Sequence, residues 1–514
     1  MHRRKLPIGI QTFAKIRADE HYYVDKTGFI RQLLDEGTHY FLSRPRRFGK
    51  SLLLDTLGEL FAGNEPLFRG LAIHPQWDWS TPHPVIRISF GGGGVQDPAE
   101  LEDKIGEQLR INLAALGLRC TEVGSGGCFA ELMRLAHAAT GQRVVVLVDE
   151  YDKPILDNLT TPEVARALRD GLRNLYSVIK DNDAHVRFVF IAGVSKFSKV
   201  SIFSGLNNLR DITVSADYSA LCGYTDMDLE TVFAPELVGL ERDEVRRWYN
   251  GYNWTGEAVY NPFDLLLLFL EREFRTWWFE TGTPTFLVEL LMARGYFTPA
   301  LGQLHASEAL LSTFDVENIS SEALLWQTGY LTFAGSRRVG ARLEYRLGYP
   351  NLEVESALND ALLKALMGDP MQAERAVARL YDVLVAADFA GLRAHLDSLF
   401  AAIPYQWHTG NPIARYEGYY ASVFYSHLAA LGLDLTAEEA SRHGRIDLTL
   451  KFNGGVWLFE FKVVELEPDG RALQQIKDRG YADPYRALEQ PIHLIGIEFS
   501  RERRGVVGFE VETL

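Results

Sequence analysis

Three residues that suit phosphate binding, Gly49, Lys50 and Ser51, stand together in the first tenth of the 514-residue chain. Residues 40–42 before them are apolar and aromatic, as in a buried strand. The segment after them carries apolar side chains at helical spacing. In a strand–loop–helix unit, the N–H groups and the dipole at the helix start favour an anion. Lys50 would then contact the outer phosphates of a nucleotide, and the Ser51 hydroxyl would bind Mg²⁺.

The loop before this glycine departs from the usual pattern, which is G-x-x-x-x-G-K-[ST]. Arg44 stands at the first glycine and Pro45 follows it, so the first turn must be built differently. Taken alone, Gly-Lys-Ser also suits an ordinary strand–helix turn with a surface lysine. The predicted nucleotide-binding residues of the loop are Arg46, Arg47, Phe48, Gly49, Lys50 and Ser51.

Two carboxylates, Asp149 and Glu150, follow an apolar run that is typical of a strand buried in a parallel sheet. Ligands of open α/β sheets bind at this end of the strands. Asp149 would hold Mg²⁺ through water, and Glu150 would polarise the water that attacks the nucleotide. The alternative is a strand end with a helix-capping carboxylate, but the Gly-Lys-Ser segment upstream favours a nucleotide site.

A further buried strand is predicted at residues 186–192, and Ser195 follows it as a candidate sensor of the terminal phosphate. Arg210, beyond the next loop, would either supply positive charge or be a surface arginine. Strands that alternate with helices in this region predict an α/β fold with a parallel, doubly wound sheet.

Length and composition set the broad class. A chain of this length is expected to form two or three domains. Hydrophobic residues make up 47% and charged residues 24%, which is normal for a globular protein, and no apolar run could cross a bilayer. We see no signal peptide, and the three cysteines suit reduced thiols, so we expect a cytoplasmic protein with no membrane partner. A net charge of −15 argues against coating nucleic acid through a general positive field, but allows a local basic groove.

Longer motifs add to this interpretation and span most of the chain. They are RPRRFGKS (44–51), VDEYDKPI (148–155), FSGLNNL (203–209), WYNGY (248–252), YNPF (260–263), FETGTPT (279–285), QTGYL (327–331) and GYPN (348–351). On these motifs the chain resembles the bacterial AAA-ATPase-like family. The resemblance implies an ATP-binding core in which the first glycine is usually missing, and a restriction-endonuclease-like domain at the C-terminus.

The C-terminal segment carries two acids and a lysine on two predicted strands. Asp447 lies on a strictly alternating strand, and Glu460 and Lys462 lie on the next strand, after the hairpin signal Asn453-Gly454-Gly455. If Asn453-Gly454 is the loop, Asp447 faces Glu460; if Gly454-Gly455 is the loop, Asp447 faces Lys462. In both registers the three side chains lie on one face. The alternative is an exposed amphipathic hairpin.

An Asp followed by Glu-x-Lys on the next strand is the pattern of the PD-(D/E)xK nucleases. Asp447 and Glu460 would bind Mg²⁺, which polarises the scissile phosphate and lowers the pKa of a bound water. Lys462 would orient that water or stabilise the charge of the transition state. Ile446 replaces the proline that often precedes the aspartate, which leaves the metal ligands intact.

Other residues would support this site. Glu417, on a predicted helix before the strands, would complete the metal shell, and Gln475 and Tyr481 fall where this nuclease family often places phosphate contacts. A group of aromatic residues would either stack bases or belong to the core. It consists of Trp407, Tyr416, Tyr419, Tyr420, Phe424 and Tyr425.

We therefore expect four regions. They are a P-loop NTPase-type α/β domain (1–223), a helical lid with a winged-helix-like part (224–351), a helical connector (352–411) and a restriction-endonuclease-like PD-(D/E)xK domain (412–514). The expected function is ATP hydrolysis that gates Mg²⁺-dependent cleavage of DNA, or of RNA, in defence or mobile-element biology. The rival is an ATP-driven switch or scaffold whose C-terminal domain binds nucleic acid or protein without cleavage. A homo-oligomer suits either function.

Overall fold

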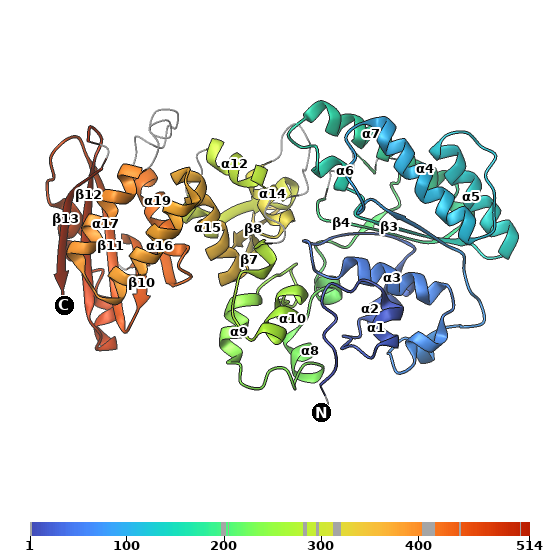
Figure 1. The fold of residues 1–514 in the computed structure, drawn as a ribbon, viewed down its shortest axis with the longest axis horizontal. Coiled ribbons are helices and arrows are strands. Elements are labelled where there is room, and N and C mark those ends of the chain that lie inside the picture. The colour runs from blue at the N-terminus through green and yellow to red at the C-terminus, as the bar shows by residue number, and fades with distance from the viewer. Residues whose placement is uncertain are drawn as a thin grey trace. The chain divides into compact units, whose positions relative to one another are not determined.

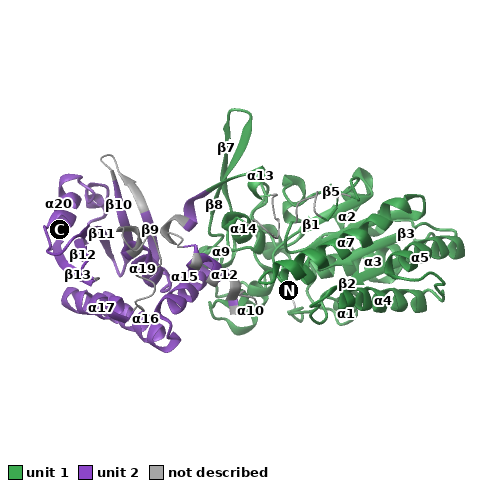
Figure 2. Cartoon of the chain, turned by 90° about the horizontal axis from the view of Figure 1, so that it is seen from above, with its two compact units in different colours: residues 1–278, 305–351 green, residues 279–304, 352–514 purple. Residues whose placement is uncertain are grey.

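The computed structural model describes residues 3–196, 202–203, 205–280, 285–294, 298–311, 320–402, 417–441, 444–503 and 505–514. The chain divides into two compact units, which Figure 2 colours separately. Unit 1 comprises residues 1–278 and 305–351, and unit 2 comprises residues 279–304 and 352–514.

Unit 1 is built on a five-stranded sheet in the order β2-β3-β4-β1-β5, in which all neighbouring strands are parallel. The strands are β1 His39–Ser43, β2 Val85–Ser89, β3 Val144–Asp149, β4 Val186–Gly193 and β5 Arg210–Asp211. The apolar strands β1, β3 and β4 are buried along nearly their whole length because helices cover both faces. This confirms the predicted α/β fold with a parallel sheet.

Helices form one layer on each side of this sheet (Figure 1). On one side lie α1 Phe13–Ala18, α2 Thr27–Glu36 and α3 Lys50–Phe61; on the other lie α4 Pro98–Ala115, α5 Ser125–Thr140 and α7 Pro162–Asp181, with α6 Lys153–Leu156 beside α7. Because β1 lies between β4 and β5, the loop between β1 and α3 leaves the sheet between these two strands, and β3 is the neighbour of β4 on its other side.

The rest of unit 1 is mainly helical and ends in a β-hairpin. Its helices are α8 Asp226–Thr231, α9 Arg242–Tyr249, α10 Pro262–Glu271, α13 Glu308–Leu311 and α14 Ser321–Thr328, and α11 Trp277–Glu280 straddles the boundary with unit 2. Strand β6 Leu304–Ser307 joins the hairpin of β7 Thr332–Val339 and β8 Arg342–Gly348 in the order β6-β8-β7.

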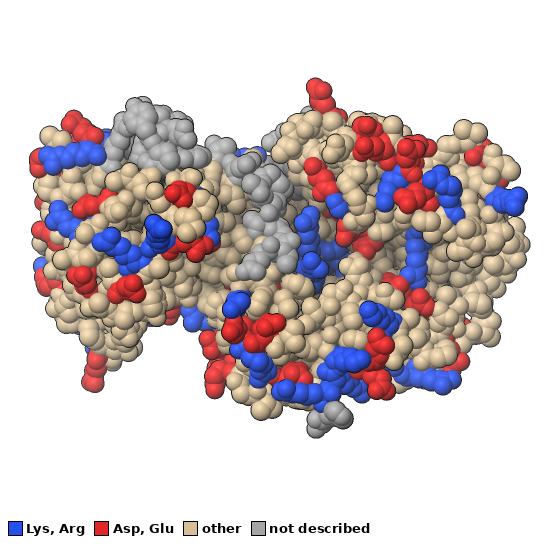
Figure 3. Space-filling model, in the orientation of Figure 1, with Lys and Arg blue, Asp and Glu red and all other residues tan. Residues whose placement is uncertain are grey.

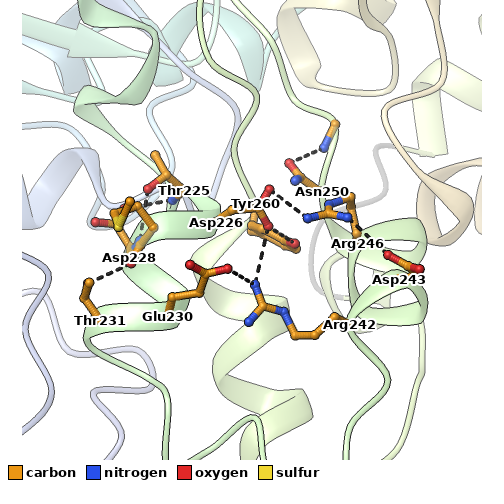
Figure 4. Close-up of polar contacts among 12 residues, drawn as sticks. Thr225, Asp226, Asp228, Glu230, Thr231, Arg242, Asp243, Arg246, Asn250 and Tyr260 are labelled. Carbon is orange, nitrogen blue, oxygen red and sulfur yellow. Dashed lines mark hydrogen bonds and ion pairs between the residues drawn. The ribbon is translucent and has the colours of Figure 1, made fainter.

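A polar network fastens α8 to α9 (Figure 4). Arg246 on α9 pairs with Asp226 on α8 at 3.2 Å, and Arg242 pairs with Glu230 at 3.1 Å. The buried Tyr260 hydroxyl donates to Asp226 at 2.7 Å, and burial raises the pKa of this tyrosine, so it remains a donor at neutral pH. These ion pairs hold α8 and α9 together.

Unit 2 contains a second five-stranded sheet in the order β13-β12-β11-β10-β9, in which only β11 and β12 are parallel. The strands are β9 Asp434–Ser441, β10 Gly444–Phe452, β11 Gly455–Val464, β12 Ile492–Ser500 and β13 Gly505–Thr513. The helices are α12 Thr285–Ala293, α15 Leu352–Met367, α16 Pro370–Val385, α17 Phe389–Ala402, α19 Glu417–Ala429 and α20 Arg471–Asp478. Side chains of α15, α16, α17 and α19 share one apolar core with the sheet, and α20 packs in a second cluster with β11 and β12.

The β10–β11 hairpin has the first of the two predicted registers. Phe452 pairs with Gly455, so Asn453-Gly454 is the two-residue loop. Both loop residues have positive φ, 50° and 73°, as a type I′ turn requires. The alternative register, with Gly454-Gly455 as the loop, is therefore wrong. Among the described residues, no helix combines the length and the apolar character needed to span a bilayer.

Candidate functional site

The loop between β1 and α3 is held by Arg44, which stands where the usual pattern has glycine. Its guanidinium is fully buried and donates to the carbonyls of Ser43 and Thr213, each at 2.9 Å, and of Tyr218 at 3.0 Å. It also lies 3.9 Å above the ring of Trp254. The first turn is thus fixed by hydrogen bonds to distant backbone rather than by the freedom of a glycine.

Lys50 begins α3, and its ammonium group lies beneath the loop. It donates to the carbonyls of Arg44 at 2.9 Å and of Pro45 at 2.8 Å. Burial lowers the pKa of Lys50, and the nearby Asp149 carboxylate opposes that shift. The half-buried Ser51 follows in the first turn of the helix. A phosphate chain in this loop would replace the two carbonyls as the partner of the lysine.

The acidic pair stands at the end of β3. Asp149 ends β3, and Glu150 has a positive φ of 51°, a strained geometry for a residue with a side chain. Burial raises the pKa of Glu150, as does Asp149, whereas the charges of Lys50 and Arg46 lower it. The charges of the loop and of the acidic pair thus act on each other. The metal-binding and catalytic roles of the acids remain predictions.

The three loop residues before Gly49 contact aromatic side chains from residues 252–278 of unit 1. The indole of Trp278 donates to the Arg46 carbonyl at 3.1 Å, and the Arg47 guanidinium lies 4.8 Å above the Phe263 ring. Phe48 is buried and packs edge-on against two further rings. They are Tyr252 and Trp254, with ring centroids 4.7 and 5.6 Å away. In this conformation Phe48 can contact a nucleotide only through its backbone.

Ser195 is tied to a carboxylate that the sequence reasoning missed. Asp152 is 1% exposed and accepts 2.5 Å hydrogen bonds from the backbone N–H and the hydroxyl of Ser195. Burial raises the pKa of Asp152. The third carboxylate of the Asp-Glu-Tyr-Asp segment was the available signal. Arg210 pairs with Glu36 at 2.6 Å, which favours the surface-arginine interpretation.

The second predicted site lies on β10 and β11. Because Leu448 pairs with Phe459 and the strands are antiparallel, the next position places Asp447 opposite Glu460. Both side chains therefore lie on one face. The Asp447 carboxylate accepts the Phe461 N–H at 2.7 Å, which fixes its orientation. Glu460 is 1% exposed and lies within the sheet.

Lys462 and Gln475 converge on Glu460. The Lys462 ammonium lies 3.1 Å from Glu460 Oε1, and the Gln475 amide on α20 donates to the same oxygen. Burial raises the pKa of Tyr481, and the Glu460 charge adds to that shift. Of the two support residues expected from the family resemblance, Gln475 is hydrogen-bonded to Glu460.

A buried glutamate that the sequence reasoning missed positions α20. Glu498 is 2% exposed and accepts the N–H groups of Asp469 at 2.8 Å and Ala472 at 3.3 Å, at the start of the helix. Gly496 lets the helix approach β12, because a Cβ there would lie 2.3 Å from the backbone nitrogen of Leu473. Together these residues hold Gln475 over the acidic pair.

Some predicted site residues lie elsewhere. Glu417 is the first residue of α19, but its side chain lies outside the described part of the structure, as do Trp407, Tyr416 and the side chain of Tyr419. The described aromatic residues of that group are buried, which supports a core role over base stacking. They are Tyr420, Phe424 and Tyr425.

The donor set of the second site suits Mg²⁺. Among the described residues, no three His, Cys, Asp or Glu side chains gather as a metal cage. The two carboxylates of this site, Asp447 and Glu460, lie on neighbouring strands. Mg²⁺ commonly takes one or two carboxylates and fills its shell with waters and substrate phosphate.

Comparison with known sequences finds a relative and two family models. A protein of Azotobacter chroococcum mcd 1, named "Uncharacterized protein in vnfD 5'region", is 68% identical over 515 residues and covers all of both chains. The family model described as "Predicted AAA-ATPase" matches residues 7–203, and the PD-(D/E)XK nuclease superfamily model matches residues 415–509. The chain belongs to the AAA-ATPase-like family. This AAA-ATPase-like protein has its loop, Lys50, Asp149 and Glu150 within the first matched region, and Asp447, Glu460 and Lys462 within the second.

Proposed function

We propose that this protein binds and hydrolyses ATP, and that its nucleotide state gates Mg²⁺-dependent cleavage of DNA. The observation that supports the cleavage step is the convergence of Lys462 and Gln475 on the buried Glu460, on the strand next to that of Asp447. Burying an acid in a sheet is costly unless it is paired or bound. Lys462 and Gln475 offset part of that cost, and a bound cation would offset more of it.

At the first site, the loop would bind the nucleotide through backbone N–H groups at the start of α3. Lys50 would move from the loop carbonyls to the outer phosphates, and Ser51 and Asp149 would hold the Mg²⁺ of MgATP. Glu150 would accept a proton from the attacking water, a role that its raised pKa favours. The tie between Ser195 and Asp152 would place the serine near the terminal phosphate.

At the second site, Asp447 and Glu460 would hold Mg²⁺, which would polarise the scissile phosphate and supply an acidic bound water. Lys462 lies beside Glu460 and would stabilise negative charge on the reacting phosphate. Gln475 would keep the Glu460 carboxylate oriented, in the way that outer-shell partners orient metal ligands.

Two variants separate the two halves of the proposal. Lys50→Ala should lose ATP binding, because it removes the cation of the loop. Asp447→Asn should keep ATP hydrolysis and lose cleavage by more than about a hundredfold, since even outer-shell changes cost up to that factor. The matched control is Asp397→Asn, an exposed acid on α17, which should behave as the wild type.

The assay measures cleavage of single-stranded, double-stranded and structured DNA with Mg²⁺ or Mn²⁺, with and without ATP. Gating requires that ATP alters the wild-type cleavage rate and that Lys50→Ala removes this response. Metal-dependent cleavage by purified Asp447→Asn at the wild-type rate would contradict the assignment. DNA binding without cleavage of any substrate would favour a non-cleaving switch, which the net charge of −15 also suits.

A further inference from the structure

The β7–β8 hairpin projects from the rest of unit 1 (Figure 2). Every residue from Ala334 to Leu343 is exposed, including the apolar side chains of Val339 and Leu343 near the tip. Its base is anchored, because Phe333 and Tyr345 are buried and stack with ring centroids 4.2 Å apart. A two-stranded ribbon without a core beneath it is only marginally stable in water. Its exposed part contributes little to the fold and is available for binding.

The hairpin is basic in a chain that is acidic overall. Between Thr332 and Gly348 it carries four arginines and one glutamate, against a net charge of −15 for the whole chain. Within the described part of the chain, the guanidinium groups of Arg338 and Arg342 form no ion pair or hydrogen bond. Arg337 pairs with Glu344 at 2.5 Å, and Arg346 donates to the Ala334 carbonyl at 2.7 Å.

The register distributes these cations over both faces of the ribbon. Arg338 pairs with Leu343, and Val339 pairs with Arg342. Side chains alternate with a period of two, so Arg338 points to one face and Arg342 to the other. Arg337 and Arg346 lie on the same face as Arg342, by the same register. The ribbon therefore presents positive charge on both of its faces.

We propose that the β7–β8 hairpin binds duplex DNA, with Arg338 and Arg342 contacting backbone phosphates on either side of a groove. The major groove of B-DNA is wide enough to admit a two-stranded β-ribbon, and rows of phosphates flank it on both sides. An acidic protein surface would meet only one face of the ribbon and leave the other arginine unused. This inference rests on the proposed function in one respect, since it takes DNA as the nucleic acid that the protein binds.

The test compares the full-length chain with the variant Arg338→Gln/Arg342→Gln. Both side chains are exposed and unbonded among the described residues, so the fold should be unaffected. The matched control is Arg110→Gln/Arg134→Gln, which removes the same charge from exposed positions on α4 and α5. Binding to a fluorescent duplex of about three helical turns is followed by anisotropy across a salt series, with EDTA present to prevent cleavage.

The hairpin variant should bind the duplex about tenfold to a hundredfold more weakly near 0.1 M salt. The slope of log K against log salt should fall by about 1.8, because each lost phosphate contact removes about 0.9. The control variant should match the wild type in both quantities. Unfolding curves of all three proteins check that the variants are folded.

Several outcomes would overturn the inference. One is that the wild type does not bind the duplex, and another is that the hairpin variant keeps the wild-type affinity and salt slope. A third is that the hairpin variant loses binding to polyglutamate as strongly as it loses binding to the duplex, which would indicate an acidic protein partner. Failure of the proposed function gives a different result. If the protein binds DNA through the hairpin but cleaves no substrate, this inference holds and the proposed function fails. If the protein cleaves DNA but the hairpin variant binds the duplex as tightly as the wild type, this inference fails.

Discussion

Replacement of Arg44 by glycine tests how the phosphate loop is held. Arg44→Gly restores the glycine of the usual G-x-x-x-x-G-K-[ST] pattern, so a pattern-based argument expects improvement or no effect. The structure predicts the opposite result. The buried guanidinium donates to the carbonyls of Ser43, Thr213 and Tyr218 and lies 3.9 Å above the Trp254 ring. Glycine would remove all four contacts and leave the carbonyls buried.

The size of the loss follows from opposing contributions. Hydrogen bonds that involve a charged group contribute about 1.5–3 kcal/mol each, and a desolvated cation–π contact contributes about 2 kcal/mol. Against this, burial lowers the pKa of Arg44 to about 10 from its ordinary value of 12.5. That shift corresponds to a desolvation cost of about 3 kcal/mol. Three hydrogen bonds at the lowest value, together with the cation–π contact and less the desolvation cost, leave a net loss of about 3 kcal/mol. The greater backbone entropy of glycine in the unfolded chain increases this loss by up to about 1 kcal/mol.

The assay is urea unfolding of the full-length wild type and variant, together with titration of a fluorescent ATP analogue. Arg44→Gly should lower the free energy of unfolding by about 4 kcal/mol, as worked out from these contacts. It should also weaken nucleotide binding. Arg44→Lys is the matched control, because it keeps the charge but loses the planar fork of donors. Its free energy of unfolding and its nucleotide affinity should lie between those of the wild type and Arg44→Gly. A glycine variant with wild-type stability and wild-type ATP affinity would refute this account of the loop.

Three further predictions concern the two sites and the core of unit 2. Gln475→Ala should slow cleavage by about tenfold to a hundredfold without changing ATP hydrolysis, because Glu460 loses an orienting donor; equal effects on both activities would indicate a folding defect instead. Glu150→Gln should keep ATP binding and slow hydrolysis by about 10²–10⁴-fold, measured by phosphate release; a wild-type rate would remove Glu150 from the mechanism. His395 and His427 are buried with ring nitrogens 2.7 Å apart, and burial lowers the pKa of His395 to about 4. Because the folded-state pKa is lower than the unfolded-state pKa, the unfolded chain takes up the proton first as the pH falls. The contribution of this histidine to the free energy of unfolding is therefore fully present above about pH 6.5 and is lost as the pH falls toward 4. Between pH 7.5 and pH 5 we therefore expect unit 2 to lose about 2 kcal/mol, and the double variant His395→Phe/His427→Leu should flatten that dependence in urea titrations; an unchanged pH dependence would show that the pair does not titrate on unfolding.

The sequence predicted the strands and the faces of their side chains where a local rule decides them. The apolar run that ends in Asp149 indicated a strand of a parallel sheet, and β3 is such a strand. Alternation on the C-terminal strands placed Asp447, Glu460 and Lys462 on one face, which either hairpin register preserves. The choice of register stayed open, because Asn-Gly and Gly-Gly both form two-residue turns.

The residues that sequence reasoning missed make contacts with distant parts of the chain. Asp152 stands in the Asp-Glu-Tyr-Asp segment, but its partners are evident only once β3 and β4 bring it to the backbone of Val194 and Ser195. Glu498 lies on β12, yet its carboxylate accepts from N–H groups at the start of α20, nearly thirty positions earlier in sequence. No spacing rule connects such pairs, because tertiary packing and not local periodicity brings them together. The Gln475 position was reached only through family resemblance.

The same reasoning explains why an arginine can replace a glycine in the phosphate loop. A glycine would meet the demands of the first turn by itself, since its backbone tolerates conformations that other residues avoid. Arg44 meets them only with partners at residues 213, 218 and 254, and the next loop positions also contact aromatic residues at 263 and 278. The loop therefore depends on the folding of residues 213–278 around it. The loop and these residues should unfold together as one cooperative unit.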